Sequence, residues 1–312
     1  MVRQAELLKE ELEALLLLLP DTPGLLELVR EPLTKVNRGL AGESRVPWPL
    51  LPLIVCQAVS GNYERALPVA AALQLLRVAA DVFDDIEDAD SSESLSAKYG
   101  PAVATNAATT LLILAERAIT RLKKRGIPDK LVVLVTDVIN SYYTTACAGQ
   151  HLDLTLTADT AAREDEYLKV ASMKSATTAK CACHTGALLA NAAQNIIDKF
   201  AKFGHNLGMA SQIANDIRGI TLGSDIIKKK MTLPLIYVFA QADDKTRSQL
   251  NRIFYNRARI DDPTPVKDLL FRAGAIHYTT VRMMSYKQRA LDDLSDLEKA
   301  GVETGLLEPF ME

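Results

Sequence analysis

Helical periodicity runs through almost the whole chain and restricts its fold more than any other feature. Apolar residues recur at three- and four-residue spacing, alanine and leucine dominate, and few β-branched runs have the length of a strand. Proline and glycine fall between these segments, where helices end. We therefore predict an all-α chain. The predicted helices cover residues 5–17, 24–37, 50–60, 64–90, 101–124, 128–151, 163–190, 193–220, 230–241, 244–256, 264–274 and 276–300.

The length of 312 residues suits either one large domain or two ordinary ones. Several predicted helices, such as those at 64–90 and 193–220, are longer than average and largely apolar, which places them inside a bundle. The clearest break, at 221–229, is short, and no change of composition marks a linker. We expect one large helical domain over residues 1–312.

Composition narrows the class of protein. The formal net charge is −3, which argues against a nucleic-acid partner because such partners require a basic surface. The first twelve residues form a charged amphipathic pattern and not a signal peptide. We find no run of the roughly 18 apolar residues that a spanning helix needs. We therefore expect no membrane span and a cytoplasmic location.

The four cysteines do not indicate disulfides or zinc. They are too few and too scattered for a disulfide framework. The run Cys181-Ala-Cys183-His184 has one residue between its cysteines, which is not the spacing of the usual zinc pairs. Small buried cysteines in an alanine-rich helix explain this run better.

An acidic cluster follows a long apolar helix at residues 81–90. Asp84 and Asp88 are four residues apart and share one helical face, with Asp81 and Asp85 on a neighbouring stripe. Like charges packed at the carboxyl end of a helix cost stability unless a cation lies among them. Carboxylates without histidine or thiolate suit Mg²⁺. The alternative is a solvated acidic helix end, the usual meaning of a charge run.

A second set of residues lies far downstream and completes a family pattern. Asp84-Asp85-Ile86-Glu87-Asp88 resembles the first aspartate-rich motif of the trans-isoprenyl diphosphate synthases, the polyprenyl synthetase family. Gln212–Asp216 resembles the start of the second motif, and Lys230–Pro234 resembles the Lys-x-Thr-Leu-Pro element. Further matches in family order lie at 99–106, 150–153 and 167–174. The resemblance covers roughly residues 40–240, and an ordered set of motifs is stronger than any single match.

This resemblance implies a fold and a reaction. The fold would be the class I isoprenoid synthase fold, a helical bundle around a central apolar cavity. The reaction would be that of a Mg²⁺-dependent class I prenyltransferase, which ionises an allylic prenyl diphosphate and transfers the prenyl group to isopentenyl diphosphate or another acceptor. Two acidic helix ends would face each other across the cavity. The family also usually forms homodimers, through helices near 101–151.

The resemblance also assigns roles to individual residues. Lysines would contact the diphosphate chiefly as point charges. The asparagine of the second motif can still offer an oxygen ligand, and two small residues would line the prenyl tunnel. The implied metal ligands are Asp84, Asp85, Asp88, Asp216 and Asn215; the catalytic set is Asp84, Asp85, Asp88, Lys174 and Lys230; and the substrate-binding set is Arg45, Arg77, Gln150, Lys174, Gln212, Lys230, Ala79 and Ala80.

The chain departs from the family pattern where a second diphosphate would bind. The family's Gly-Gly-Lys-Arg-x-Arg-Pro stretch corresponds to residues 43–49, where only Arg45 is basic, and Arg77 stands at the family's histidine position. Losing arginines should weaken binding of a second diphosphate, because a charged hydrogen bond is worth about 1.5–3 kcal/mol. In the second acidic motif, Asn215 and Gly219 replace aspartates.

Three functions fit this mixture of matches and losses. The first is a prenyltransferase whose acceptor is isopentenyl diphosphate or a non-phosphorylated nucleophile, as in the pheromone-peptide prenyltransferases. The second is a terpene cyclase, which needs only one diphosphate; however, Gly219 and Gly223 occupy the serine and glutamate positions of the cyclase metal triad. The third is a catalytically silent subunit of a partner synthase, which the damaged second motif favours and the intact first motif opposes.

Overall fold

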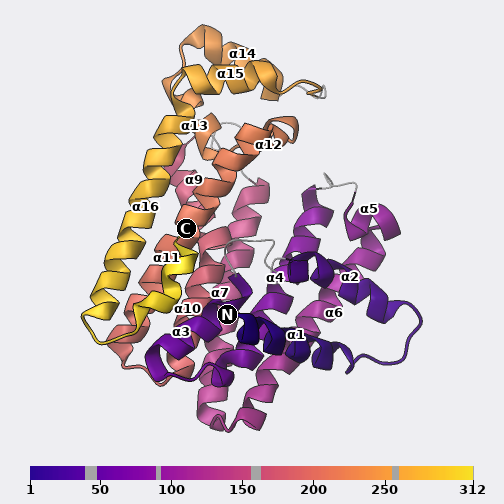
Figure 1. Ribbon diagram of the computed structural model, residues 1–312. Helices are drawn as coiled ribbons and strands as arrows, with labels where there is room; N and C mark the ends of the chain where they lie inside the picture. Colours follow the sequence, from indigo (N-terminus) through magenta and orange to yellow (C-terminus); the bar gives the residue numbers. More distant parts are fainter. Residues whose placement is uncertain (39–47, 89–92, 156–162, 255–259, 312) are drawn as a thin grey trace. The chain divides into compact units, whose positions relative to one another are not determined.

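The computed structural model describes residues 1–38, 48–88, 93–155, 163–254 and 260–311. Every regular element in these ranges is a helix (Figure 1), which confirms the all-α prediction. The chain divides into two compact units, and each is described by itself. Unit 1 comprises Met1–Ser141, Thr178–Lys202 and Asp293–Glu312, and unit 2 comprises Tyr142–Thr177 and Phe203–Asp292. The single domain expected over residues 1–312 stays a prediction.

Unit 1 is built mainly from the amino-terminal helices. These are α1 (Val2–Leu16), α2 (Leu25–Arg38), α3 (Leu51–Ser60), α4 (Leu67–Asp88), α5 (Leu95–Tyr99), α6 (Pro101–Thr120) and the first part of α7 (Asp129–Thr155). Most of α10 (Thr177–Leu189), the start of α11 (Gln194–Leu222) and the end of α16 (Ala275–Glu298) complete it. Short 3₁₀ turns lie at Trp48–Leu50, Glu64–Ala66, Arg121–Arg125 and Thr304–Phe310.

Helix α4 is the central helix of unit 1. It is buried along most of its length from Leu67 to Val82, and it packs against α1, α3 and α6. Burying an apolar side chain of leucine size stabilises a fold by about 1.5–3 kcal/mol, so this helix contributes strongly to the core. Its apolar body ends where the acidic residues begin, which fixes the acidic cluster to a rigid element.

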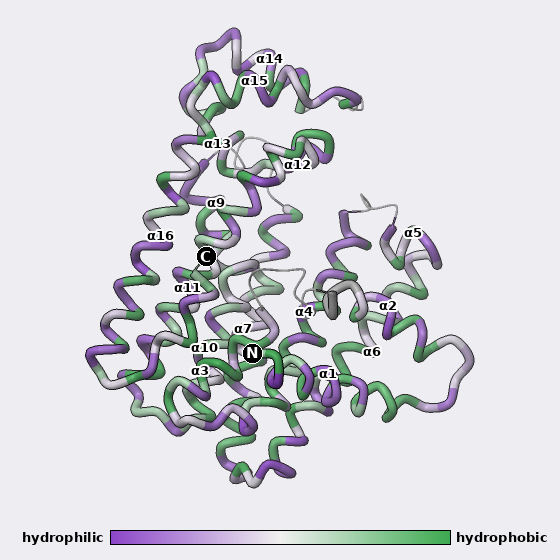
Figure 2. Tube along the Cα trace, in the orientation of Figure 1, coloured by the Kyte–Doolittle hydropathy of each residue, from purple (hydrophilic) through white to green (hydrophobic). Residues whose placement is uncertain are grey.

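Unit 2 contains the rest of α7 and α11, and α16 up to Asp292. It also contains α9 (Glu164–Ala171), a π-helical turn at Ser172–Ala176, α12 (Ser224–Ile227), α13 (Leu233–Gln241), α14 (Asp244–Phe254) and α15 (Thr264–Arg272). Helices α11 to α15 share one apolar cluster, whose largest members include Ile220, Leu235, Phe239, Leu250 and Leu270. Figure 2 shows hydrophobic and hydrophilic residues alternating along α16, as expected of a helix with one buried face.

Most predicted helices agree with the structure to within a few residues. The exceptions are informative. The helix predicted at 163–190 is divided by the π turn, and the helix predicted at 64–90 is a 3₁₀ turn followed by α4. The short elements α5 and α12 and the final 3₁₀ turn were not predicted. Helix α13 begins at Leu233, three residues later than predicted, with Pro234 in its first turn.

Three helices in the described ranges are long and apolar enough to cross a membrane, judged by length and composition only. They are Glu64–Asp88, Pro101–Arg125 and Asp129–Thr155. The apolar window of the first is 78% buried inside the protein, whereas that of the third is only 11% buried. The prediction that no stretch has the length and composition of a spanning helix is therefore wrong, whereas the absence of a membrane span stays a prediction.

Candidate functional site

The first acidic cluster occupies the last turns of α4. Helix α4 ends at Asp88, so Asp81, Asp84, Asp85 and Asp88 all lie in its carboxyl-terminal part. The apolar side of the same turns packs against α5 and α6: Val82 is buried there, with Phe83 and Ile86 against the same cluster. The apolar side chains therefore anchor the end of α4 to its neighbours. The carboxylates occupy the remaining positions of these turns and are half-buried or exposed.

Asp81 shows the electrostatic cost of the cluster. Although its side chain is 59% exposed, loss of solvation raises the pKa of Asp81. The Arg77 guanidinium, whose Nη2 lies 3.5 Å from Asp81 Oδ2, lowers this pKa, and the nearby carboxylates of Asp84 and Asp85 raise it. The carboxylates thus repel one another, and added positive charge would relieve that repulsion. Arg77, expected to contact substrate, instead contacts Asp81 in this structure.

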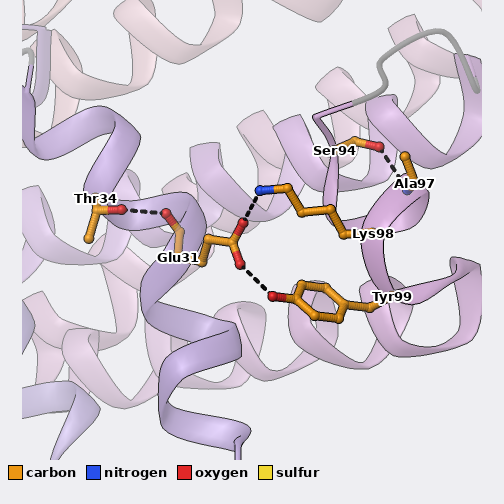
Figure 3. Close-up of polar contacts among 6 residues, drawn as sticks. All are labelled: Glu31, Thr34, Ser94, Ala97, Lys98 and Tyr99. Atoms are coloured by element: carbon orange, nitrogen blue, oxygen red, sulfur yellow. Dashed lines mark hydrogen bonds and ion pairs between the residues drawn. The ribbon is translucent and has the colours of Figure 1, made fainter.

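The region that follows the cluster is held by Glu31 on α2 (Figure 3). The Glu31 carboxylate accepts hydrogen bonds from Lys98 Nζ at 2.6 Å and from Tyr99 Oη at 3.1 Å, both on α5. Ser94 caps the amino terminus of α5, and its hydroxyl accepts from the Ala97 backbone N–H at 3.1 Å. These contacts tie α5 to α2, and α5 in turn packs against α6.

Asp216 is the centre of the second acidic motif and lies in unit 2. Its side chain is 3% exposed, and both of its oxygens accept hydrogen bonds. Oδ2 accepts from the Leu233 backbone N–H at 3.0 Å, and Oδ1 accepts from Gln212 Nε2 at 2.9 Å. The buried Tyr167 hydroxyl on α9 lies close to this carboxylate. Asp216 therefore joins α11 to the start of α13.

Burial raises the pKa of Asp216 to about 6. The hydrogen bonds from Leu233 and Gln212 and the nearby Tyr167 hydroxyl lower it, and the negative charge of Asp225 raises it. The pKa of Tyr167 is also raised, first by burial and then by its proximity to Asp216. The Asp216 carboxylate is buried with hydrogen bonds to both oxygens, which is the form in which a buried polar group is tolerated.

Asn215, the other predicted ligand of this motif, is exposed, and its Oδ1 accepts from Arg218 Nη2 at 2.8 Å. Gln212, predicted to contact phosphate or water, donates to Asp216. Neighbours in sequence therefore have separate environments: Asp216 is enclosed by unit 2, whereas Asn215 lies at its surface.

Lys174 lies in the π turn of unit 2 and pairs with Asp153 on α7, with Nζ 2.7 Å from Oδ2. Two glycines allow the flanking helices to approach this turn. A Cβ on Gly149 of α7 would lie 2.6 Å from the Lys174 backbone nitrogen, and one on Gly208 of α11 would lie 2.6 Å from Ala176 Cα. A π turn is rare and is often found at functional sites. Here two glycines hold it between neighbouring helices.

Lys230 lies between α12 and α13. Its backbone N–H donates to the Asp225 carbonyl oxygen at 2.8 Å, and its charge lowers the pKa of the Asp225 carboxyl, which burial raises. The preceding residue, Lys229, has a φ of 55°. A left-handed conformation at a residue other than glycine is uncommon.

Unit 2 therefore brings together three pairs among the predicted residues and their neighbours: Gln212 with Asp216, Lys174 with Asp153, and Lys230 with Asp225. In unit 1, Ala79 is buried and Ala80 is exposed. Arg45 lies outside the described residues. The first acidic cluster belongs to unit 1 and the second to unit 2, so their convergence on one cavity stays a prediction.

The chemistry of the first cluster fits Mg²⁺, since it offers hard carboxylate oxygens and no thiolate or imidazole. Among the described residues, no three histidine, cysteine, aspartate or glutamate side chains are grouped closely enough to hold a metal ion by themselves. In proteins, Mg²⁺ is usually bound by one or two carboxylates together with water and substrate phosphate oxygens.

Sequence reasoning missed several partners at these positions. Tyr167 was noted only as part of a motif, and nothing indicated that its hydroxyl would reach Asp216. Asp153 was noted only as part of a motif, and its ion pair with Lys174 was not predicted. Gly149 and Asp153 are four residues apart and share one face of a helix, which indicates that both face the same neighbour. Gln150, the residue after Gly149, is half-buried.

Comparison with known proteins gives a consistent result. A family model described as polyprenyl synthetase matches residues 45–269. The chain is 29% identical over 246 residues to the tryptophan prenyltransferase ComQ of Bacillus spizizenii, covering 77% of this chain and 84% of the relative. It is 26% identical over 293 residues to the geranylgeranyl diphosphate synthase of Methanosarcina mazei, covering 89% and 88%.

A solved structure with the same fold is the polyprenyl synthase from Caulobacter crescentus CB15, complexed with calcium and isoprenyl diphosphate. The TM-score is 0.82 at 20% sequence identity, and the match covers 100% of this chain and 94% of that chain. At this identity the likeness concerns the fold, and it confirms the predicted isoprenoid synthase fold. The central cavity itself stays a prediction.

Proposed function

Because this chain belongs to the polyprenyl synthetase family, and is thereby a prenyltransferase, we propose that it cleaves an allylic prenyl diphosphate with Mg²⁺ as cofactor. The observation that carries the proposal is the aspartate cluster at the end of α4, held on a rigid apolar helix. Isolated like charges there would be costly, and a divalent cation with a diphosphate would neutralise them.

The residues of each unit have separate tasks in this proposal. Bound Mg²⁺ would act as a Lewis acid that polarises the diphosphate oxygens. Asp84, Asp85 and Asp88 would hold it in unit 1. In unit 2, Lys174 and Lys230 would bind the departing diphosphate as point charges, with Asp153 orienting the first and the backbone of Asp225 the second. Asp216 would position the start of α13 and would contribute to the metal site with Asn215, while Gln212 would contact the substrate phosphate or a water molecule.

The acceptor distinguishes two forms of this function. Only Arg45 is basic within residues 43–49, where chain-elongating relatives bind a second diphosphate, although Arg77 offers another cation. A relative 29% identical to this chain is a tryptophan prenyltransferase. Both observations favour a non-phosphorylated acceptor such as an indole side chain over isopentenyl diphosphate. An indole needs no paired cations, so the loss of arginines carries no penalty.

Product analysis tests the proposal. The protein would be incubated with Mg²⁺ and allylic diphosphates of ten, fifteen and twenty carbons, each alone, with isopentenyl diphosphate, and with a tryptophan-containing peptide. A prenylated peptide supports the favoured form, and a longer diphosphate supports elongation. A hydrocarbon or alcohol from the single substrate identifies a cyclase. No turnover, together with activation of an added family member, identifies a silent subunit and overturns the proposal.

Asp85→Ala is the variant for this experiment, with Glu116→Ala on the exposed side of α6 as its control. We expect Asp85→Ala to abolish turnover because one of the metal-holding carboxylates is lost. The control should retain wild-type rates. Wild-type turnover by Asp85→Ala would contradict the assigned role of the cluster.

Two further proposals concern assembly and location. Helices α6 and α7 expose large apolar side chains, including Ile113 at 59%, Val133 at 68% and Leu134 at 46%. Exposed apolar area of this kind marks an interaction surface, and we propose a second copy of this chain as the partner. Light scattering would give a dimer mass, and Val133→Glu should shift it to a monomer.

We propose a cytoplasmic location, which fractionation of cells would test.

A further inference from the structure

Gly219 stands where the second acidic motif of the family has its last aspartate. In this structure the side chain of Asp225 occupies the space beside Gly219. A Cβ placed on Gly219 would overlap the carboxylate of Asp225. Both Asp225 oxygens and its Cγ crowd that position. The Asp225 carboxylate therefore lies directly over the α11 backbone at residue 219, where a side chain on α11 would otherwise begin.

A second glycine makes this arrangement possible. Gly223 ends α11 with a φ of 86°, a conformation that favours glycine, and the short helix α12 starts immediately afterwards. A Cβ on Gly223 would also lie 2.7 Å from Pro263 Cγ. With α11 stopped there, the chain turns and Asp225 folds back over the preceding turn. A continued helix would carry Asp225 away from Gly219 along the axis.

The Asp225 carboxylate has a hydrogen-bond contact, from Ser224, and the backbone of the same turn is held by further hydrogen bonds. Ser224 Oγ lies 3.4 Å from Asp225 Oδ1 and donates to the Gly219 carbonyl oxygen at 3.3 Å. The Asp225 carbonyl oxygen accepts from the Lys230 N–H at 2.8 Å. The charge of Asp225 also acts on Asp216, one turn before Gly219. The side chain is thus fixed beside both the second motif and the lysine proposed to bind diphosphate.

We infer that Asp225 supplies the carboxylate that the second motif lacks at position 219, and that it serves there as a ligand for the divalent cation bound with diphosphate. This inference rests on the proposed function. Asp225 then compensates for the missing aspartate at position 219. Relative to the family pattern, the carboxylate comes from the turn after α11 and not from α11 itself.

The inference can be tested by moving the carboxylate. Asp225→Asn removes the charge and keeps the shape, whereas Gly219→Ala keeps the charge and displaces it with a new Cβ. The double variant Gly219→Asp/Asp225→Ala returns the carboxylate to α11. Asp268→Asn, an exposed aspartate on α15, is the matched control. The probe is Mg²⁺ titrated at a fixed concentration of inorganic diphosphate, and the readout is the melting temperature.

Asp225→Asn and Gly219→Ala should each raise the Mg²⁺ concentration for half-maximal stabilisation by about tenfold, the effect of one lost charged ligand. The double variant should recover most of the wild-type response to Mg²⁺. The control Asp268→Asn should respond as the wild-type protein does. Wild-type titrations for Asp225→Asn would overturn the inference alone, since the proposed function then still stands through Asp85. No Mg²⁺ response in the wild-type protein would overturn both. Circular dichroism without ligand identifies variants that fail to fold.

Discussion

The Tyr167 hydroxyl on α9 lies close to the buried carboxylate of Asp216 on α11 and lowers the pKa of that carboxylate. Asp216 accepts hydrogen bonds from Gln212 and from the backbone at the start of α13, so one carboxylate joins α11 to α13 and lies near α9. The residue that the sequence marks as a metal ligand is therefore part of the internal framework of its unit. Any role toward a cation is exercised from this fixed position.

Tyr167→Phe should destabilise the protein by about 1–3 kcal/mol, because it removes the buried hydroxyl that favours the charged form of the Asp216 carboxylate and leaves the apolar ring in place. Urea unfolding at constant pH measures this difference. Tyr63→Phe is the control, since the Tyr63 hydroxyl has no hydrogen-bond partner among the described residues, and it should change stability by less than about 0.5 kcal/mol. Equal midpoints for the two variants would contradict the contact with Asp216.

Gly208→Ala should destabilise the protein by about 1–3 kcal/mol, although glycine to alanine within a helix ordinarily stabilises it. The sign reverses because the new Cβ would lie 2.6 Å from Ala176 Cα, a backbone atom that moves only if α11 and the π turn separate. Thermal unfolding gives the comparison. Gly305→Ala, whose Cβ would meet nothing within 4 Å, is the control and should be neutral.

Lys174→Ala should lower kcat/KM for the allylic diphosphate by about 10- to 100-fold, the worth of one charged hydrogen bond of about 1.5–3 kcal/mol. Lys169→Ala, an exposed lysine on α9 in the preceding turns, is the matched control. Steady-state kinetics with a radiolabelled allylic diphosphate measures kcat/KM for both variants. If both variants lose activity equally, the loss comes from the reduced positive charge of the protein and not from the position of Lys174.

Chelation of divalent cations should abolish turnover, and Mg²⁺ should restore it. In the same samples, adding Mg²⁺ with inorganic diphosphate should raise the melting temperature, because positive charge relieves the repulsion among Asp81, Asp84 and Asp85. Asp85→Asn should show a smaller rise, measured by differential scanning fluorimetry. Full activity after exhaustive dialysis against a chelator would rule out the cation requirement.

Sequence reasoning gave the helical class and most helix positions, because long amphipathic and apolar stretches carry a strong periodic signal. It placed the acidic cluster at the end of α4 for the same reason. The π turn was invisible, since Ser172–Ala176 contains no proline or glycine and does not interrupt the apolar pattern. Short elements such as α5 and α12 have too few residues for a period to be read.

The site was harder to predict than the fold. Asp216 was interpreted as a ligand because carboxylates in this family order bind metal, but its burial depends on Leu233 and Tyr167, which are distant in sequence. The sequence alone does not place Asp225 relative to Gly219. Gly223 ends α11, so the true position of the Asp225 carboxylate depends on a turn that sequence spacing does not specify.

The segment that carries Lys230 is fastened at both ends: the Lys230 N–H is bonded to Asp225, and the Leu233 N–H is bonded to Asp216. A segment already ordered in this way loses little conformational entropy when an anion arrives. The backbone of Lys230 is therefore fixed in position before the anion binds, as a preorganised catalytic site requires. Cutting either tether should therefore weaken anion binding through disorder, even with every positive charge retained.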